Sequence, residues 1–413
     1  MNTEKSTVAI VGLGNVGFSV AQLCAAKGHQ TIGLDIRKSR VERVKNQRIE
    51  NLTATLEPSE ALAKADIVVI CVPTTLDTRD KPNLRNLKRA LLQASTFLRR
   101  ETLVIVESTV PVGTIERVAI PVLEQSGRKC GTDFYLAYCP ERLDVGNQDW
   151  PLERIPRVLA AVDPMSAKKA KEFYTSLLGS RIVDLGSVRT AELAKLLENC
   201  FRELNIALVN ELSWCVPKLG VKLNDAIKGA STKPFGFMPF FPGPGIGGGC
   251  LPTSTHFLLY CLNRVGESSK LLAMSRNINS ESTKRVTKLV EEAIAELGRS
   301  SGKPVITILG LSYKENAIDT NGSPALVVRD NLVRKGYQVK LFDPDIEKLS
   351  SAKSLEDSIM GSDCVVVTTQ RKEFLILNAD YLKRKQVKSV VDCRSQLDGE
   401  SIASQGIIYK GIG

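Results

Sequence analysis

A lone cysteine, Cys250, ends a run of glycines and prolines that begins at Pro242 and reads PGPGIGGGC. Glycine lets a backbone adopt positive φ and approach a bound group closely, whereas proline stiffens the flanks. Such a run can hold a thiol at the mouth of a site. The alternative is a flexible connector with an incidental cysteine, although glycine-rich linkers usually contain serine rather than flanking prolines. Cys250 is therefore the first candidate for covalent chemistry.

A second chemical pattern lies near the N-terminus, where Gly12, Gly14 and Gly17 follow a short β-branched segment and open a helical pattern. In a strand-turn-helix unit the first glycine makes the tight turn, the second lets a pyrophosphate approach the helix, and the third permits close packing. The next strand ends on Asp35, whose carboxylate can accept hydrogen bonds from ribose hydroxyls and would repel a 2′-phosphate. The pattern predicts a dinucleotide site that favours NAD, while Arg37 leaves NADP open.

Two further apolar strands, at 65–72 and 102–106, each end on polar residues. Ligands of open α/β sheets bind outside the carboxyl ends of the strands, so we expect Thr74 and Thr109 near a cofactor or a reactive water. Simple turn-capping hydroxyls are the alternative. The predicted cofactor-binding residues are Gly12, Leu13, Gly14, Asn15, Val16, Gly17, Asp35, Arg37, Val72, Pro73, Thr74, Ser108 and Thr109.

A long amphipathic helix is predicted over 190–220, because apolar residues recur there at helical spacing. Its length suits a central helix that joins two lobes. Lys195 and Asn199 are four residues apart and so share one side of this helix, beside its apolar stripe. They are either functional or part of a solvated polar face.

The segment from 303 onward repeats the organisation of the first: strands at 305–309 and 338–342, the second ending on Asp343, and another at 362–369. The turn after its first strand, Gly310 to Lys314, lacks the pyrophosphate glycines. We predict an α/β fold with two Rossmann-like, doubly wound parallel-sheet domains joined by a long central helix. The expected domains are 1–187 for NAD, 188–300 for the central helices with Cys250, and 301–413 for a ligand other than a second NAD.

Composition narrows the function classes. The 413 residues carry a net charge of +11, but the basic residues are spread out and only 5% of residues are aromatic, so anionic small molecules explain the charge better than nucleic acid does. Two histidines far from a plausible ligand set predict no metal site. No apolar run approaches the roughly 20 residues that span a bilayer, so no membrane insertion is expected. Ten scattered cysteines without a CxxC pair indicate a reducing cytoplasm.

Together these motifs resemble the UDP-glucose/GDP-mannose dehydrogenase family, which oxidises a sugar C6 alcohol to an acid in a four-electron reaction. The resemblance extends over nearly the whole chain, and the segment 231–237 is most similar to the branch acting on UDP-N-acetylhexosamines. The segments that carry it are Gly12 to Gly17 with Asp35, CVPT at 71–74, ESTVP at 107–111, PERL at 140–143, AELAKLLEN at 191–199, GGGC at 247–250 and GLSYK at 310–314.

The resemblance implies a role for each candidate residue. Cys250 would form a thiohemiacetal and then a thioester. Lys195 and Asn199 would stabilise charge on the sugar oxygen, and Glu141 and Thr109 would hold water or move a proton. The implied catalytic residues also include Ser254, and the implied substrate-binding residues are Glu141, Arg142, Leu143, Lys195, Asn199, Lys233, Phe241, Gly245, Gly247, Gly248, Tyr313, Lys314 and Arg394. A UDP-sugar substrate and a homodimer or higher homo-oligomer paired through the central helix are expected.

The chain departs from the family pattern at three positions. Ser254 stands where the family usually has an aspartate, and a hydroxyl is no carboxylate base near neutral pH. Gly249 replaces a histidine common in the branch, and Asn321 replaces a common arginine that assists the cofactor. Three hypotheses follow: a complete UDP-sugar 6-dehydrogenase, a member that stops at the aldehyde or passes the thioester to another nucleophile, and a non-catalytic nucleotide-sugar-binding protein.

Overall fold

The computed structural model describes residues 5–144, 147, 149–179, 181–298, 303–315 and 318–413. These residues form two compact units. The first contains the described residues up to Glu198 together with His256–Ser268, and the second contains Asn199–Thr255 and the described residues from Ser269 onward. The predicted boundary at 300/301 lies outside the described residues. The predicted three-domain division stays a prediction.

The first unit is built on an eight-stranded sheet with the order β10-β9-β8-β7-β4-β1-β2-β3. From β3 to β8 all neighbours are parallel, which is the Rossmann strand order, and β9 joins β8 antiparallel. The strands are β1 (Thr7–Val11), β2 (Gln30–Leu34), β3 (Leu52–Thr55), β4 (Ile67–Ile70), β7 (Leu103–Val106), β8 (Tyr135–Tyr138), β9 (Arg157–Ala161) and β10 (Ile182–Asp184). A hairpin of β5 (Thr75–Leu76) and β6 (Pro82–Asn83) follows β4.

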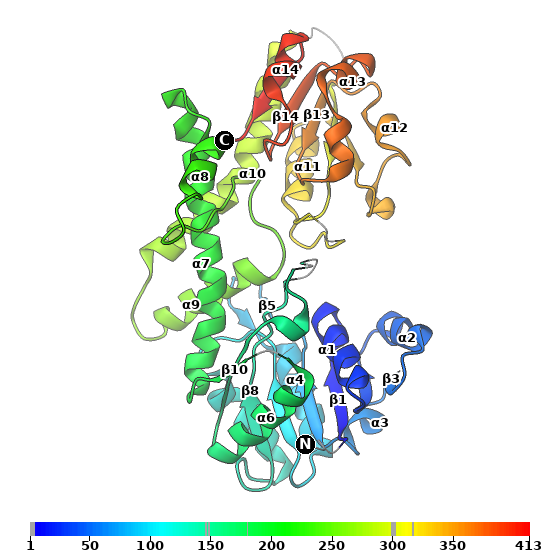
Figure 1. Cartoon of the computed structure of the whole chain (residues 1–413), viewed down its shortest axis with the longest axis vertical. Coiled ribbons are helices and arrows are strands. Elements are labelled where there is room, and N and C mark those ends of the chain that lie inside the picture. The colour runs from blue at the N-terminus through cyan, green and yellow to red at the C-terminus, as the bar shows by residue number, and fades with distance from the viewer. Residues whose placement is uncertain (1–4, 145–146, 148, 180, 299–302, 316–317) are drawn as a thin grey trace. The chain divides into compact units, whose positions relative to one another are not determined.

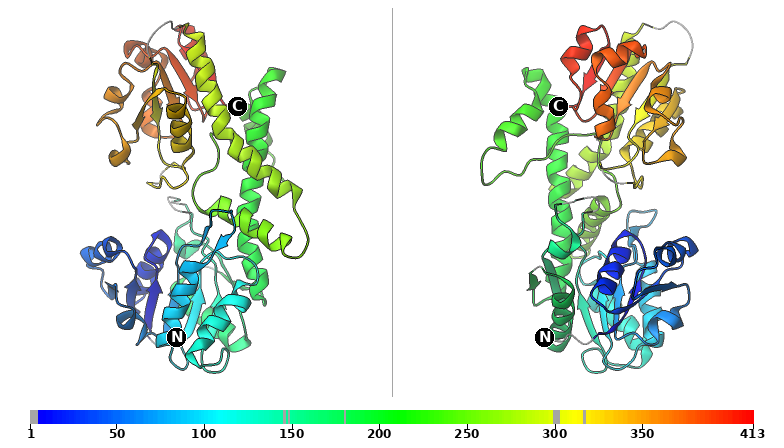
Figure 2. Two further views of the ribbon diagram at one scale, coloured as in Figure 1. Left: turned by 180° about the vertical axis from the view of Figure 1, so that it is seen from behind. Right: turned by 45° about the vertical axis from the view of Figure 1, so that its right-hand side comes forward.

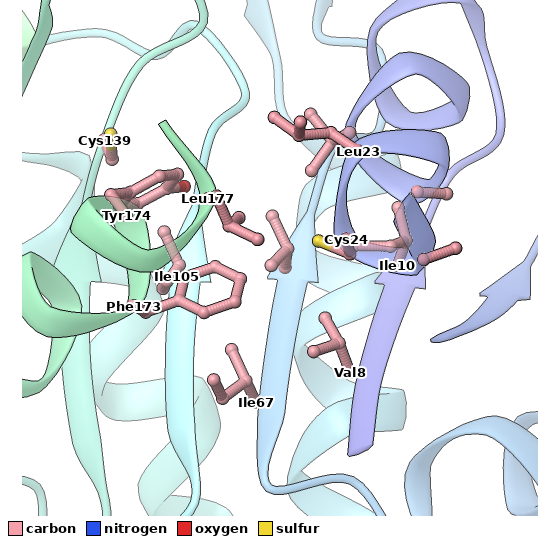
Figure 3. Packing of buried hydrophobic residues seen from close by; sticks show 14 of the residues in the cluster. Val8, Ile10, Leu23, Cys24, Ile67, Ile105, Cys139, Phe173, Tyr174 and Leu177 are labelled. Carbon is pink, nitrogen blue, oxygen red and sulfur yellow. The ribbon is translucent and has the colours of Figure 1, made fainter. Parts of the chain in front are cut away.

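Both faces of this sheet are covered, which explains why its central strands are apolar at every position. Helices α1 (Asn15–Ala26), α2 (Lys38–Gln47) and α6 (Pro164–Leu177) pack on one face. Figure 3 shows part of that core, with Leu23 and Cys24 of α1 and Phe173 and Tyr174 of α6 packed over the strands. The opposite face carries α3 (Pro58–Leu62), α4 (Arg85–Phe97) and α5 (Ile120–Leu123).

The second unit contains an all-parallel sheet with the order β12-β11-β13-β14-β15. Its strands are β11 (Val305–Leu309), β12 (Gln338–Phe342), β13 (Cys364–Val367), β14 (Ser389–Asp392) and β15 (Ile408–Gly411). The core on one face is built with α10 (Lys270–Glu296) and α11 (Pro324–Arg334), and that on the other with α12 (Leu355–Ile359), α13 (Ala379–Arg384) and α14 (Gly399–Ser404). Figure 2 shows these layers from two further sides. The second doubly wound domain is therefore confirmed.

The predicted central helix is α7 (Val188–Cys215), the long green ribbon of Figure 1. It ends five residues before the predicted end at Gly220, because a 3-10 turn, Val216–Leu219, follows it with Pro217 inside and Gly220 as its left-handed cap. Helix α8 (Leu223–Ala230) comes next, and Cys250 opens α9 (Cys250–Asn263). Within the described part of the chain, no helix combines the length and apolar character needed to cross a membrane.

Candidate functional site

The three N-terminal glycines have the distinct environments that the motif requires. Gly12 adopts a φ of +98°, and a Cβ there would lie 2.9 Å from the Cys71 carbonyl oxygen. At Gly17 a Cβ would lie 1.9 Å from the Gly12 carbonyl oxygen, so only glycine permits this packing of α1 on the turn. Gly14, the N-cap of α1, is less crowded: a Cβ there would come no closer than 3.9 Å to a neighbour, the Arg40 guanidinium, and no side chain caps the helix. The first turn of α1 is therefore free to receive a phosphate.

Asp35 lies at the end of β2 with its carboxylate buried against this turn. One carboxylate oxygen accepts from the Leu13 backbone at 2.8 Å and from Arg40 at 3.0 Å, and the other accepts from the Arg37 backbone at 2.9 Å. A lone pair remains for a ribose hydroxyl. Arg37 and Arg40 both border the site, so the negative charge of Asp35 is partly balanced there.

A cavity of about 300 Å³ extends from the turn and will be called the dinucleotide cavity. It lies at the point where the strand order reverses between β1 and β4, which is where open α/β sheets bind ligands. The lining includes the predicted residues Gly12, Asp35, Arg37, Val72 and Pro73. Arg89 and Gln93 of α4 also line it, and the sequence patterns did not single them out. These residues fit an adenosine dinucleotide.

The hydroxyls at the strand ends cap turns. The Thr74 hydroxyl donates to the Thr109 carbonyl at 2.6 Å, and the Ser108 hydroxyl donates to the Val72 carbonyl at 2.7 Å. These bonds tie the loop after β4 to the loop after β7. Thr74 and Ser108 therefore match the turn-capping alternative. The Thr74 hydrogen bond also holds the backbone of Thr109 in place.

Glu141 belongs to a buried ionic cluster at the carboxyl edge of the first sheet. One of its oxygens accepts from the backbone of Arg142 at 2.7 Å and of Leu143 at 2.6 Å, and the other lies 2.7 Å from the Arg157 guanidinium. These three donors occupy most of the four lone-pair positions of a carboxylate. The motif residues Arg142 and Leu143 thus fix the Glu141 side chain, and Arg142 also pairs with Glu198 at 2.8 Å.

Glu107, which directly follows β7, is a second acid in that cluster, and the sequence analysis assigned it no role of its own. It accepts a hydrogen bond from Tyr174 and one from Cys71 at 3.5 Å, and it lies 3.9 Å from Arg157. Burial raises the pKa of Glu107 to about 7, although the Arg157 charge opposes the shift. The first unit therefore holds a carboxyl group that titrates near neutral pH beside the predicted Glu141.

In the second unit, Asn199 of α7 is held in place by Ser254. The Asn199 amide donates to the Ser254 hydroxyl at 2.8 Å, and that hydroxyl donates to the Cys250 carbonyl at 2.8 Å. Ser254 is fully buried, and Asn199 is 5% exposed. The serine thus links the helix that carries Asn199 to the first turn of α9. Lys195, one turn earlier on α7, is partly buried and belongs to the first unit.

Cys250 is the first residue of α9 and is exposed. The N-terminal end of a 14-residue helix favours negative charge, which suits a thiolate nucleophile. The glycines before it are tightly placed: a Cβ at Gly247 would lie 2.4 Å from the Tyr313 side chain, and Gly248 donates to the Asn321 carbonyl at 2.8 Å. The run is a fixed loop rather than a flexible connector.

A cavity of about 240 Å³ in the second unit, here called the nucleotide cavity, is lined by six of the thirteen predicted substrate-binding residues. It opens at the strand-order reversal between β11 and β13. The predicted residues on its lining are Phe241, Gly245, Gly247, Tyr313, Lys314 and Arg394. Arg202 of α7 and Thr369 also line it and were not anticipated, because a single cation on a helix face carries no distinctive pattern. The lining, with three cations, suits a diphosphate.

Five predicted site residues of the second unit do not line this cavity, namely Asn199, Lys233, Gly248, Cys250 and Ser254. The Lys233 ammonium lies 4.9 Å from the centre of the Phe235 ring, and this exposed segment does not line the nucleotide cavity. Ser254 is buried below the start of α9 and does not line it either. Leu251, next to Cys250, does line the cavity, so the thiol lies one residue from its wall.

The fold and these residues define a dinucleotide-binding protein. Its second unit holds the nucleotide cavity, which is lined by cations. Sequence models of the UDP-glucose/GDP-mannose dehydrogenase family match its NAD binding domain at 6–178, its central domain at 189–281 and its UDP binding domain at 307–399. The chain therefore belongs to the UDP-glucose/GDP-mannose dehydrogenase family. It is an NAD-dependent nucleotide-sugar dehydrogenase, as the sequence analysis predicted.

Similar proteins cover the whole chain. A UDP-N-acetyl-D-mannosamine dehydrogenase of Pyrococcus horikoshii is 31% identical over 98% of this chain and 99% of its own length. One from Methanococcus maripaludis is 33% identical over 100% of this chain and 98% of its own. A solved structure of a UDP-D-ManNAc dehydrogenase from Pyrococcus horikoshii has a TM-score of 0.90 at 31% identity and covers 98% of each chain.

Proposed function

We propose that the protein oxidises C6 of a UDP-N-acetylhexosamine to the uronic acid in two steps at Cys250. The observation that carries this proposal is the position of Cys250, exposed at the start of α9 and adjacent to Leu251 on the wall of the nucleotide cavity. Relatives named for UDP-N-acetyl-D-mannosamine support the choice of sugar. UDP-glucose is the alternative substrate.

In this mechanism NAD, when bound, supplies the hydride acceptor for both oxidations. The Cys250 thiolate adds to the C6 aldehyde and forms a thiohemiacetal, whose oxidation leaves a thioester that water cleaves to the acid and the free thiol. Lys195 and the second N–H of the Asn199 amide stabilise the negative oxygen at C6. Glu141 and Thr109 hold the water, and Lys314 and Arg394 bind the diphosphate.

Ser254 supports a second candidate function. It occupies the position of the usual aspartate, and its hydroxyl is buried with a donor and an acceptor already engaged. A buried hydroxyl in that state does not take a proton from water. The second candidate is therefore an enzyme that stops at the aldehyde or passes the thioester to a nucleophile other than water.

One experiment separates the two candidates. The protein is incubated with NAD and, in separate reactions, UDP-N-acetylmannosamine, UDP-N-acetylglucosamine, UDP-glucose and GDP-mannose, and NADH and the product mass are measured together. We expect two NADH per acid for a UDP-N-acetylhexosamine. One NADH per aldehyde would favour the second candidate, and no NADH with any sugar would contradict both.

The matched variant is Cys250→Ala, with Cys215→Ala, an exposed cysteine at the end of α7, as the control. We expect Cys250→Ala to lose acid formation by roughly 100-fold or more while it still binds NAD, because only the covalent step needs the thiol. Acid formation that survives in Cys250→Ala would exclude the thioester route.

We also infer a homodimer. Five large apolar side chains of α7 are at least 37% exposed and recur at helical spacing, whereas its polar residues Glu192, Asn199, Glu203 and Asn210 are buried. Large apolar side chains that are exposed at helical spacing form an apolar stripe along the helix, and exposed apolar patches are typical of protein interfaces. The exposed residues are Leu193, Leu197, Phe201, Leu208 and Leu212, here called the α7 apolar stripe.

A further inference from the structure

The first unit contains a second cavity, of about 530 Å³, that the dehydrogenase mechanism does not use. Its walls come from the β5–β6 hairpin, the first turn of α4, the π-helical segment Ile115–Ala119 and the far end of α9. Four cationic side chains line it against one carboxylate, Asp77, and we call it the cationic cavity. The four cations are Arg85, Lys88, Arg117 and Arg264.

The cationic cavity is separate from the dinucleotide cavity, with which it shares no lining residue. Helix α4 borders both cavities with different side chains: Asn86 and Arg89 belong to the dinucleotide cavity, whereas Arg85 and Lys88 belong to the cationic cavity. The α4 helix thus stands between two ligand-sized spaces. A molecule in one does not have to leave for a molecule to enter the other.

The four cations are not balanced by acids. Across the residues that the structure describes, none of the four lies within ion-pair distance of a carboxylate, and their side-chain partners are neutral: Arg85 donates to the Asn83 side chain at 3.3 Å and Arg117 to the Val112 carbonyl. The Asp77 carboxylate is used within its own hairpin, where it accepts from the backbone of Arg79 at 2.8 Å and of Lys81 at 2.9 Å.

Helix α4 adds to the positive potential. Arg85 and Lys88 lie in its first turn, which contains no acidic residue, and its N-cap Leu84 has no capping side chain. The N-terminal end of a helix already carries partial positive charge, so cations there are repelled and an anion is attracted. This placement is unfavourable by itself, and a bound anion would relieve it.

We propose that the cationic cavity binds a phosphorylated small molecule with at least two phosphate groups, of the size of a nucleoside diphosphate or triphosphate. The phosphates lie among Arg85, Lys88, Arg117 and Arg264, because guanidinium groups bind phosphate oxygens in paired hydrogen bonds. Tyr260 of α9, which is partly buried on the same wall, offers a ring face to the base. The segment Ile115–Ala119, which borders this cavity, follows the Thr109 loop in the chain. A ligand in the cationic cavity can therefore influence the position of that loop without occupying the reaction site.

The first test uses inorganic pyrophosphate as the probe. Isothermal titration is performed on the full-length protein with NAD at saturating concentration, so that the dinucleotide cavity is occupied. UDP is left out, because it is itself a nucleoside diphosphate and would compete for the cationic cavity. A pyrophosphate site that is lost in Lys314→Ala/Arg394→Ala is assigned to the nucleotide cavity and is not counted. We expect one saturable site in the wild type and binding weakened roughly tenfold or more in the double variant Arg117→Ala/Arg264→Ala, since charged hydrogen bonds are lost. Arg79→Ala, an exposed arginine on the same hairpin, is the matched control and should bind as the wild type does.

A second measurement keeps the proposal testable if the double variant is damaged. Lys88→Ala removes one exposed cation. Without pyrophosphate, the variant should unfold at the same temperature as the wild type. With pyrophosphate, its unfolding temperature should rise less than that of the wild type. ATP and GTP should bind more tightly than pyrophosphate. In Tyr260→Leu the affinity for ATP and GTP should fall to that for pyrophosphate, while the affinity for pyrophosphate stays unchanged. The proposal is overturned if the wild type shows no saturable site, or if all variants bind equally.

Discussion

At the scale of single residues, we propose that position 254 influences how the thioester of the proposed mechanism is removed. The Ser254 hydroxyl links the Asn199 amide to the Cys250 carbonyl and has no contact with solvent. It therefore acts on the chemistry through the orientation of Asn199, and we regard it as a positioning residue. An aspartate at this position would still accept from Asn199, but its second oxygen would be available as a base.

We predict that Ser254→Asp lowers the amount of sugar bound to Cys250 as a thioester during turnover. Quenched enzyme analysed by intact-protein mass spectrometry should show a thioester adduct in the wild type and less of it in Ser254→Asp, with faster release of the acid. In Ser254→Ala the Asn199 amide loses its acceptor, which costs about 1 kcal/mol or more, so turnover should fall while the adduct remains. Equal adduct in wild type and Ser254→Asp would show that residue 254 does not control hydrolysis.

At the scale of elements, α7 buries polar side chains beside its buried apolar ones. Glu192 accepts hydrogen bonds from the backbone of Gly113 and of Ile115, so it binds the start of the π-helical segment to α7. Glu203 is fully buried and accepts from Thr255 at 2.7 Å and from Arg276 at 2.8 Å. Periodicity predicts this helix correctly but cannot tell which face is buried, because the polar partners come from distant segments.

Glu192 also predicts a dependence of stability on pH. Burial raises its pKa to about 7 from the ordinary 4.5, against the effect of the backbone donors. Between pH 4.5 and about pH 7, the Glu192 carboxyl therefore keeps its proton in the folded state and has lost it in the unfolded state. Its contribution to the free energy of unfolding is full below pH 4.5 and is lost as the pH rises through about 7.

The measurement is the temperature of the first unfolding transition at pH 5.5 and pH 8. We expect Glu192→Gln to show a smaller decrease between these values than the wild type, since an amide does not titrate. The control is Glu116→Gln, a carboxylate that is paired with Arg189 and has a side chain 37% exposed. It should keep the wild-type difference, and an unchanged difference in Glu192→Gln would assign the dependence to other groups.

At the scale of the whole molecule, the two sheets use the same connection between their first two strands but different ligand spaces. Leu13 donates to Asp35 at 2.8 Å, and the corresponding Leu311 donates to Asp343 at 2.7 Å. In the second sheet, however, Arg371 lies 3.0 Å from Asp343. The Arg371 side chain is 6% exposed, whereas that of Arg40, which lies at the same distance from Asp35, is 29% exposed, so Asp343 is the more enclosed of the two carboxylates.

Thr369 packs against the turn after β11. Its hydroxyl donates to the Ser312 carbonyl at 2.6 Å, and a Cβ on Gly310 would lie 2.7 Å from its side chain. The turn after β11 therefore presents a different surface from the turn after β1, because Thr369, Tyr313 and Lys314 line the nucleotide cavity there. The absence of the pyrophosphate glycines from the sequence indicated this difference.

The α7 apolar stripe gives a prediction about assembly. We expect the wild type to be a dimer in light scattering after size-exclusion chromatography, and Leu197→Glu/Leu208→Glu to be a monomer, because two charges would be buried without partners. The two leucines are 59% and 52% exposed, so the folded chain should tolerate the change. Met165→Glu, at an exposed methionine of α6, is the control and should stay dimeric. A monomeric wild type would contradict the inference.

The sequence by itself determined the strands, the glycine turn with Asp35, the long helix and Cys250, because these depend on local periodicity and on the backbone freedom of glycine. Only the tertiary structure decided the rest. It placed Arg202 and Thr369 on the nucleotide cavity and Lys233 away from it. It also buried Ser254 against Asn199, 55 residues away in the chain. Hydrogen bonds between distant segments leave no periodic trace, so the partner of a polar side chain is known only once the chain has folded.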